Sequence, residues 1–439
     1  MAPEMFDKLT EPMVNKLANG LEFSYLDEEH YPTVQVRDIH NTKSSDITCE
    51  LTFFYLTQGI ADPLRGVRFN LNSMRTRKDM AKTLREWLIN PSDLFHDKTE
   101  LIIEDICWRT LKDYRTGTPA VNIDEPPTNP MLEYQLYPLL VKGLPTTIYS
   151  PGDFGKSIIA QLITVLVQFN VSALGWLPTA GNVLYLDWEE DEEKLRRYIT
   201  AIKKGLDITE SQQILYRSVE HDLTEEIASV KALVIANKID LVIIDSQMAA
   251  TAEGKYGADS ASVSSMYYNA LRELHCTSLT LDHTTKVVMD GAESSAPYGS
   301  VVKFNRSRSQ FELKHTQEAG DDFIDLCLVH RKFNLGIKQK PIGIHADFTN
   351  NDNVLERITF SDFDVANNAA FFKIQSRTDR LVTALKGMGR ASIKELAEAI
   401  GEPENERIIG VTLSKDKKRF VRLQEGIYGL LTHQSNLLS

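Results

Sequence analysis

The eight residues SPGDFGKS, which run from Ser150 to Ser157, have the types and the spacing to hold phosphate groups. They match the phosphate-binding pattern G-x-x-x-x-G-K-[ST] except at its first position, where serine replaces glycine. In such a loop, backbone N–H groups point at phosphate oxygens, Lys156 reaches the β- and γ-phosphates, and Ser157 coordinates Mg²⁺. The candidate nucleotide-binding residues are therefore Ser150, Pro151, Gly152, Asp153, Phe154, Gly155, Lys156, Ser157 and Ile158.

The segments on either side of this loop suit its function. TTIYS predicts a strand before the loop, and SIIAQLITVLVQF predicts a helix after it. Because a chance match would lack this order of strand, loop and helix, we interpret the loop as functional. Ser150 is small enough to close the strand into the turn. Asp153 brings a negative charge close to the phosphates and predicts weak triphosphate binding and slow turnover unless its side chain points outward.

Two other predicted strands end in carboxylates. The apolar run LVIID ends in Asp245, where a buried strand would deliver a carboxylate to the Mg²⁺ ion. The run VLYLDWEE (183–190) ends in several acids, among which we favour Glu189 as the general base for an attacking water. Acids are also favoured by the dipole at the start of a helix, which is a sufficient explanation for residues 191–193.

Apolar runs alternate with helical segments between residues 131 and 360, the order expected for a parallel sheet with crossover helices. This region therefore predicts an α/β core. Residues 1–120 combine alternating apolar runs with a helical pattern and predict an α+β accessory domain, whose role the sequence does not indicate. Between them, residues 121–130 belong to a proline-rich stretch that sustains neither a helix nor a central strand, which indicates a linker.

With these motifs in order, residues 130–348 resemble RecA-fold ATPases of the hexameric RepA type, the family of plasmid replicative helicases. The resemblance rests on the loop and on four further segments: YLDWEEDEEKLRRYI, LVIIDS, LTLDHTTK and PYGSVVKFNRSRSQFELK. It implies that Glu189 is the catalytic glutamate and that His283 senses the γ-phosphate. It also implies that Arg308 reaches into the adjacent subunit, with Arg306 as an equally placed alternative, and it gives Lys332 a nucleotide or interface role.

The resemblance also implies cofactors and partners. A relative of this family would be a RecA-like P-loop NTPase that binds ATP with Mg²⁺, and Ser157 and Asp245 would hold the metal. It would form a homo-oligomer such as a hexameric ring and would act on DNA. The implied catalytic set is Lys156, Glu189, Asp245, His283 and Arg308.

Residues 370–433 resemble a winged helix. SIKELAEAIG would be the first helix of the pair, with Ser392 and Glu395 forming a capping box, and ENERIIGVTLSKD would be the recognition helix. KRFVRLQEGIYGLL predicts a hairpin that turns near Glu425 and Gly426. Between Arg377 and Arg422 there are 11 Lys or Arg and 7 Asp or Glu, a modest excess that favours DNA but leaves a protein partner open.

Composition limits the remaining possibilities. A chain of 439 residues predicts two or three domains, and a net charge of −12 argues against nucleic-acid binding over the whole surface. The sequence has no apolar stretch long enough for a membrane span and no apolar signal region near its start, so we expect a cytoplasmic protein. The four cysteines lie far apart and predict neither a disulfide framework nor a zinc site.

The leading hypothesis is thus a ring-forming, Mg²⁺-dependent ATPase that moves along or remodels DNA in replication or in a mobile element, which includes helicase activity. The alternative is an ATP-sensing DNA-binding regulator or loader, in which the RecA-like core acts as a switch. A recombinase-like filament is a third hypothesis, although no polymerising segment is evident near the amino terminus.

Overall fold

The computed structural model describes residues 11–431 except for a set of gaps. The gaps are 18–19, 26–32, 43–45, 55, 58–59, 62–63, 88–95, 118–119, 121, 125–128, 130, 190–191, 252–259, 285–300, 353 and 366–367. The predicted linker at 121–130 therefore lies largely outside the described residues. Internal contacts divide the chain into two units, Met1–Met131 with Glu226–Ala236, and Leu132–Glu225 with Asn237–Ser439.

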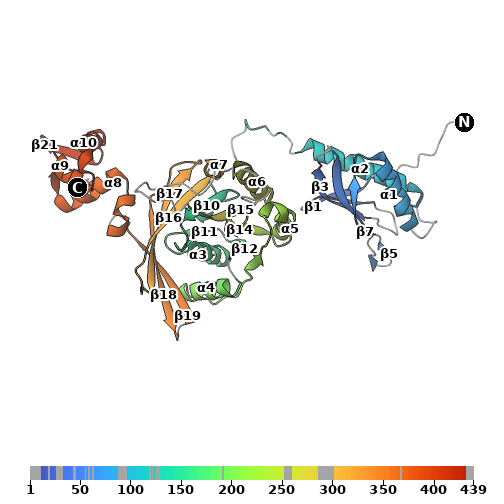
Figure 1. The fold of residues 1–439 in the computed structure, drawn as a ribbon, viewed down its shortest axis with the longest axis horizontal. Coiled ribbons are helices and arrows are strands. Elements are labelled where there is room, and N and C mark those ends of the chain that lie inside the picture. Colours follow the sequence, from blue (N-terminus) through green and yellow to red (C-terminus); the bar gives the residue numbers. More distant parts are fainter. Residues whose placement is uncertain are drawn as a thin grey trace, which may run out of the picture. The chain divides into compact units, whose positions relative to one another are not determined.

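The amino-terminal unit is an antiparallel sheet with two helices packed on one face (Figure 1). The sheet order is β1-β2-β3-β4-β7, with strands β1 Met13–Leu17, β2 Gly20–Ser24, β3 Thr33–Asn41, β4 Ile47–Phe54 and β7 Leu64–Asn70. A short pair, β5 Leu56–Thr57 and β6 Ile60–Ala61, precedes β7; α1 Met74–Trp87, the 3₁₀ turn His96–Lys98 and α2 Thr99–Thr116 follow. Alternate residues of the strands pack against α1 and α2 in one apolar core.

The second unit is built on a nine-stranded sheet in the order β13-β12-β14-β15-β10-β16-β17-β18-β19. The strands are β10 Pro145–Ser150, β12 Asn182–Asp187, β13 Leu215–Ser218, β14 Ile239–Asp245, β15 Thr277–His283, β16 Ser309–Thr316, β17 Phe323–Phe333, β18 Ile342–Asn351 and β19 Val354–Phe363. The strands from β13 to β16 pair in parallel, and β17 to β19 extend the sheet antiparallel. The parallel part confirms the predicted α/β core.

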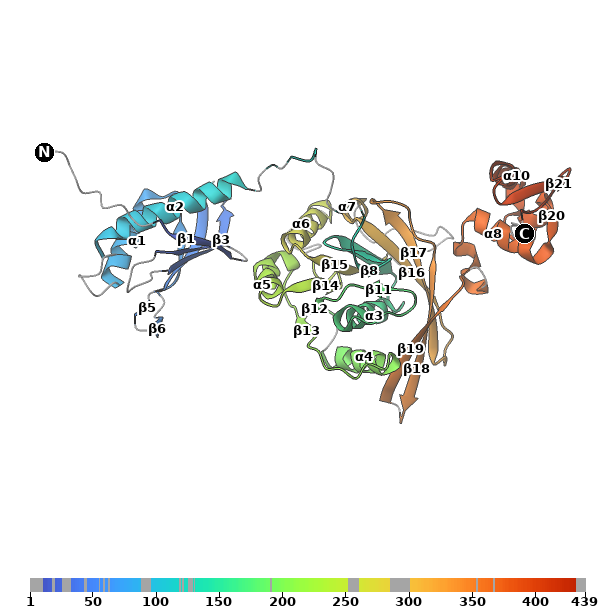
Figure 2. The same cartoon turned by 180° about the vertical axis from the view of Figure 1, so that it is seen from behind.

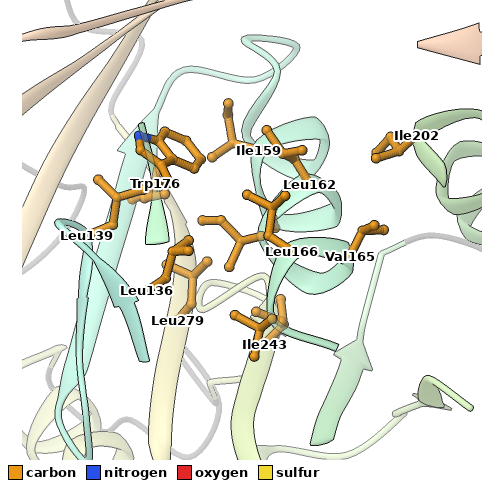
Figure 3. Close-up of a cluster of buried hydrophobic side chains, with 14 of the residues drawn as sticks. Leu136, Leu139, Ile159, Leu162, Val165, Leu166, Trp176, Ile202, Ile243 and Leu279 are labelled. Atoms are coloured by element: carbon orange, nitrogen blue, oxygen red, sulfur yellow. The ribbon is translucent and has the colours of Figure 1, made fainter. Parts of the chain in front are cut away.

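Helices connect the parallel strands as crossovers. They are α3 Lys156–Phe169, α4 Glu192–Gly205, α5 Leu223–Ala236, α6 Ser260–Glu273 and α7 Val301–Arg306. A small sheet of β8 Tyr134–Tyr137, β9 Leu140–Val141 and β11 Leu177–Pro178 lies beside α3 (Figure 2). Figure 3 shows Leu166 of α3 between Trp176 and Ile243, with Leu162 in the same apolar cluster, so that the helix following the phosphate-binding loop is fixed in the core.

The described chain after β19 first packs back on the sheet. Val365 and Phe371, the latter in the 3₁₀ segment Ala369–Ile374, join Cys327 and Val329 of β17 in a small apolar cluster. The core thus continues past residue 360, where the sequence placed its end.

The last elements form a cluster with its own apolar core. They are α8 Arg377–Met388, β20 Arg390–Ser392, α9 Ile393–Ala399, the 3₁₀ turn Pro403–Asn405, α10 Glu406–Lys415, β21 Phe420–Gln424 and β22 Ile427–Leu430, with sheet order β20-β22-β21. Ser392 and Glu395 form the capping box at the start of α9. The hairpin of β21 and β22 turns at residues 425–426, where Gly426 has a φ of 76° that suits glycine.

All four cysteine thiols are free. Among the described residues, no helix has both the length and the apolar character that a membrane crossing requires.

Candidate functional site

The phosphate-binding loop leaves β10 at Ser150 and enters α3 at Lys156. Gly155 adopts a φ of 80°, and a Cβ on it would lie 3.0 Å from the side chain of Leu326. Glycine is therefore required there both for the backbone conformation and for the close approach. The ring of Phe154 packs on His315 of β16 with 3.9 Å between ring centroids, which anchors the loop to a neighbouring strand.

Lys156 is buried and folds back on the loop itself. Its Nζ donates hydrogen bonds to the carbonyl of Pro151 at 2.8 Å, to Ser150 Oγ at 3.2 Å and to the Ser150 carbonyl at 3.3 Å. Burial lowers the pKa of Lys156, whereas the negative charges of Asp245 and Glu189 raise it. The serine that departs from the glycine pattern thus supplies a hydrogen-bond acceptor for the lysine, a role that sequence reasoning missed.

Ser157 and Asp245 lie side by side, as a Mg²⁺ site requires. Ser157 Oγ donates to Asp245 Oδ2 at 2.9 Å, and the hydroxyl of Tyr185 donates to the same oxygen at 2.8 Å. Burial raises the pKa of Asp245 to about 6, against the two hydrogen bonds, which lower it. A hydroxyl and a carboxylate are the oxygen ligands that Mg²⁺ accepts together with phosphates and water.

No group of three or more His, Cys, Asp or Glu side chains suited to a metal ion occurs among the described residues. A Mg²⁺ ion held by one carboxylate, one hydroxyl, phosphate oxygens and waters needs no such group. The residues present therefore fit Mg²⁺ bound together with a nucleotide.

Glu189, just beyond the end of β12, is held in place by two neighbours. Its Oε1 accepts a hydrogen bond from the Ser246 hydroxyl and lies 3.4 Å from Nε2 of His283. The hydrogen bond from His283 lowers the pKa of Glu189; burial raises it, and Ser246 lowers it further. Glu189 is thus an ionised carboxylate restrained at the edge of the pocket. Ser246 was missed from the sequence, although it directly follows Asp245 on the same strand pattern.

These groups line one pocket of about 560 Å³. Seven of the nine predicted loop residues, Gly152 through Ile158, contribute to its wall, and so do Glu189, Asp245 and His283. Ser150 and Pro151 are not among the lining residues and instead accept hydrogen bonds from Lys156 Nζ. Asp153 lines the pocket, so its side chain belongs to the electrostatic environment of any bound phosphate.

The far wall of the pocket comes from elements that the motifs do not include. Tyr198 of α4, Ile324 of β17, Phe348 of β18 and Leu355 of β19 supply apolar surface suited to a nucleotide base. The polar residues Gln317, Asp321, Asp322 and Asn350 also line the pocket. No spacing in the sequence connects these segments, because the order of the strands in the sheet brings them together.

Arg308 lies apart from the other predicted catalytic residues. Its N–H donates to the Pro145 carbonyl at 3.3 Å, and the following residue, Ser309, pairs with Thr146. It is therefore at the amino end of β10, whereas the phosphate-binding loop is at the carboxyl end. It lines a second pocket of about 380 Å³ with Arg306, Arg272 and His275.

Lys332 supports the segment that leads to Arg308. Its Nζ donates to the carbonyls of Asn305 at 2.9 Å and Ser307 at 2.8 Å. Burial lowers the pKa of Lys332, and the charge of Arg308 lowers it further. The side chain thus caps the end of α7 and is not among the residues that line the nucleotide pocket.

Comparisons with known proteins agree with the coarse assignment. Residues 114–289 match a family model described as an AAA domain, and this range includes the loop, Glu189, Asp245 and His283. No curated protein matches the chain. Together with the strand–loop–helix geometry, this match supports a P-loop ATPase domain in the matched part of the chain.

Similar solved structures include two archaeal proteins. One is a KaiC-like protein from Pyrococcus horikoshii, with 13% identity, a TM-score of 0.34, and coverage of 51% of this chain and 93% of that one. The other is the flagellar accessory protein FlaH from Methanocaldococcus jannaschii, with 15% identity, a TM-score of 0.33, and coverage of 51% and 90%.

Proposed function

We propose that this chain is an Mg²⁺-dependent ATPase of the RepA and RecA type that assembles into a ring and moves along or remodels DNA. The observation that carries the proposal is the convergence of Lys156, Ser157, Glu189, Asp245 and His283 in one pocket. These residues come from separate segments of the chain, and together they supply the groups that phosphoryl transfer to water requires.

The chain's own residues account for binding and orientation of the triphosphate. Lys156 would exchange the carbonyls of Ser150 and Pro151 for β- and γ-phosphate oxygens, so its present contacts keep a buried cation satisfied until the nucleotide arrives. Ser157 and Asp245 would hold Mg²⁺, which shields the charge on the phosphate oxygens when bound.

Glu189 is proposed to accept a proton from the attacking water. Its carboxylate is ionised but engaged by Ser246 and His283. If His283 turns to the γ-phosphate, Glu189 loses one of these two contacts and becomes available to water. Hydrolysis would then depend on a complete triphosphate, because a diphosphate offers His283 no γ-phosphate oxygen.

Arg308 is proposed to act on the nucleotide of an adjacent copy. Its position at the amino end of β10 keeps it away from the loop of its own chain, which supports a role across a subunit interface. In a ring every such contact is head-to-tail, so each site would receive an arginine. Arg306 lines the same pocket and stays the alternative.

DNA is the proposed partner of the carboxyl-terminal elements. Their helix and hairpin order supports a winged helix, in which α10 would enter the major groove. Arg407 and Lys415 are exposed on α10 and suit phosphate contacts. Ile408 and Val411 are also exposed on this helix, which suits either thymine methyl groups or a protein partner.

The test is steady-state ATP hydrolysis with Mg²⁺, with and without single-stranded DNA, on the wild type and on Glu189→Gln. We expect DNA to stimulate turnover and Glu189→Gln to lower it by about 10²- to 10⁴-fold. Glu192→Gln is the matched control, because Glu192 is exposed and pairs with Arg196 outside the pocket. Hydrolysis that ignores DNA would instead favour the alternative, an ATP-sensing regulator or loader with the core as a switch.

A further inference from the structure

The amino-terminal unit has an exposed aromatic ring in a basic setting that the ATPase proposal does not use. Trp108 of α2 is 58% exposed, whereas Trp176 in the core is 1% exposed. Its indole N–H has no hydrogen-bond partner among the described residues. Tryptophan is enriched at contact surfaces, because its ring packs on a partner while its N–H can donate a hydrogen bond.

Trp108 lines a pocket of about 450 Å³ that is formed by residues of α2 and by Arg77 of α1. The charged residues that line it are Arg77 from α1 and Glu104, Lys112 and Arg115 from α2. On α2, residues 104, 108, 112 and 115 follow one another at intervals of three or four, so they form one stripe on the helix surface.

The charge of this pocket is positive. Glu104, its one carboxylate among the described lining residues, forms an ion pair with Arg77 at 2.7 Å. Lys112 and Arg115 have no carboxylate partner among the described residues. Lys112 Nζ instead lies 4.9 Å from the centroid of the Trp108 ring, where the ring and the cation attract each other.

An aromatic ring beside cations that have no carboxylate partner in the described part of the chain has the chemistry to bind single-stranded nucleic acid. A base can stack on the exposed indole, and the phosphates next to it can reach Lys112, about one turn farther along the helix, and Arg115, about two turns farther. A duplex does not fit this arrangement, because its bases are already stacked on each other. An acidic peptide could satisfy the cations but would not require the flat face of an aromatic ring.

We propose that the stripe of Trp108, Lys112 and Arg115 is a binding site for single-stranded nucleic acid, with Trp108 as the stacking residue. The site shares no lining residue with the nucleotide pocket, so we expect binding without ATP. It gives the amino-terminal unit a function that the loop motifs do not include, and Trp108 and Lys112 lie outside the range of the AAA family match, which begins at residue 114.

The test uses the full chain without nucleotide and a fluorescently labelled oligothymidylate as the probe. Anisotropy titrations should show that Trp108→Ala weakens binding by about 5- to 100-fold, the effect of losing one stacked base. Trp108→Phe should keep most of the affinity, because a ring remains. Tyr114→Ala is the matched control, since Tyr114 is an exposed aromatic residue of α2 that does not line the pocket.

A second readout covers the case in which another part of the chain dominates the affinity. Tryptophan fluorescence should be quenched when oligothymidylate binds, and the quenching should be lost in Trp108→Phe. Lys112→Glu should weaken binding at low salt and make it less dependent on salt. Equal binding and equal quenching in Trp108→Ala, Trp108→Phe and the wild type would overturn the proposal. So would a wild type that binds inorganic polyphosphate but not oligothymidylate. ATP hydrolysis is measured separately, so its failure leaves these outcomes unaffected.

Discussion

The carboxyl and amino ends of the parallel strands carry charged side chains in two different arrangements. At the carboxyl end, Lys156 donates to the loop carbonyls, Ser157 donates to Asp245, and Glu189 is held by Ser246 and His283. At the amino end, the guanidinium groups of Arg272, Arg306 and Arg308 share one pocket, and none has a side-chain hydrogen bond or ion pair with another described residue.

The difference indicates which end of the strands can bind a nucleotide with residues of this chain only. Buried polar groups that satisfy one another form a prepared site, because they change partners without first being desolvated when a ligand arrives. Unpaired arginines around a pocket attract an anion from outside the fold. Under the proposed function, the carboxyl end binds this chain's own nucleotide and the amino end serves the nucleotide of a neighbour.

The largest effect on ATP hydrolysis is expected from a substitution in the nucleotide pocket, at the carboxyl end of the strands. Lys156→Ala removes the cation that contacts the phosphates, so ATP hydrolysis should fall to background because both binding and turnover depend on it. Steady-state hydrolysis measures the loss, and a thermal melt checks that the fold is retained. Turnover close to that of the wild type would remove the loop from the catalytic account.

A smaller effect is expected at the amino end. Arg308→Ala should lower the hydrolysis rate of the assembled protein by roughly 10³-fold while nucleotide binding persists, because the arginine acts on the transferring phosphoryl group and not on binding alone. Fluorescent-nucleotide titration and steady-state hydrolysis separate the two properties. Arg306→Ala is the matched variant, since Arg306 lines the same pocket.

Mixing variants distinguishes a trans arginine from a cis one. A subunit with Arg308→Ala keeps a complete phosphate-binding loop, and a subunit with Lys156→Ala keeps Arg308. In a randomly mixed ring, about a quarter of the interfaces combine that loop with that arginine, so about a quarter of the wild-type rate should return. A mixture that stays inactive, or an Arg308→Ala protein with a normal assembled rate, would contradict the trans assignment. Recovery with Arg306→Ala in place of Arg308→Ala would transfer the role to Arg306.

The sequence predicted the parts of the site that lie in consecutive residues. The strand, the loop and the helix from Thr146 to Phe169 are neighbours along the chain, so local pattern is sufficient to identify them. Asp245 was predicted for a similar reason, because a buried apolar run that ends in a carboxylate marks the end of a parallel strand.

The contacts that complete the site depend on strand order, which no local pattern contains. Tyr185 reaches Asp245 because β12 pairs with β14, and Phe154 meets His315 because β16 pairs with β10. The apolar wall at Tyr198 and Phe348 requires the antiparallel extension from β17 to β19. The hydroxyl of Ser150 was overlooked for another reason, since the consensus pattern treats that position as a turn and not as a hydrogen-bonding group.

A buried ion pair links the carboxyl ends of the parallel strands to the segment that carries Arg308. Breaking this pair is expected to have the smallest effect of the substitutions considered. Asp282 precedes His283 on β15, and its Oδ2 lies 3.5 Å from Nζ of Lys303 on α7, the helix that leads to Arg308; these side chains are 1% and 2% exposed. Removing one partner of a buried pair leaves an uncompensated charge, so Lys303→Met should lower the free energy of unfolding by about 3 kcal/mol.

The loss of unfolding free energy in Lys303→Met should be larger at high pH than at low pH. Burial raises the pKa of Asp282 and Lys303 lowers it, so the pKa of Asp282 rises further in Lys303→Met. A carboxyl with a raised pKa in the folded state is stable when protonated and destabilises the fold as the pH rises through that pKa. The urea midpoint should therefore fall more at pH 8 than at pH 5. Lys204→Met is the control, because its pair with Glu356 is half exposed and worth roughly 1 kcal/mol or less. An equal loss at the two pH values would mean that Asp282 does not carry the uncompensated charge, and the link between the two ends would then rest on packing alone.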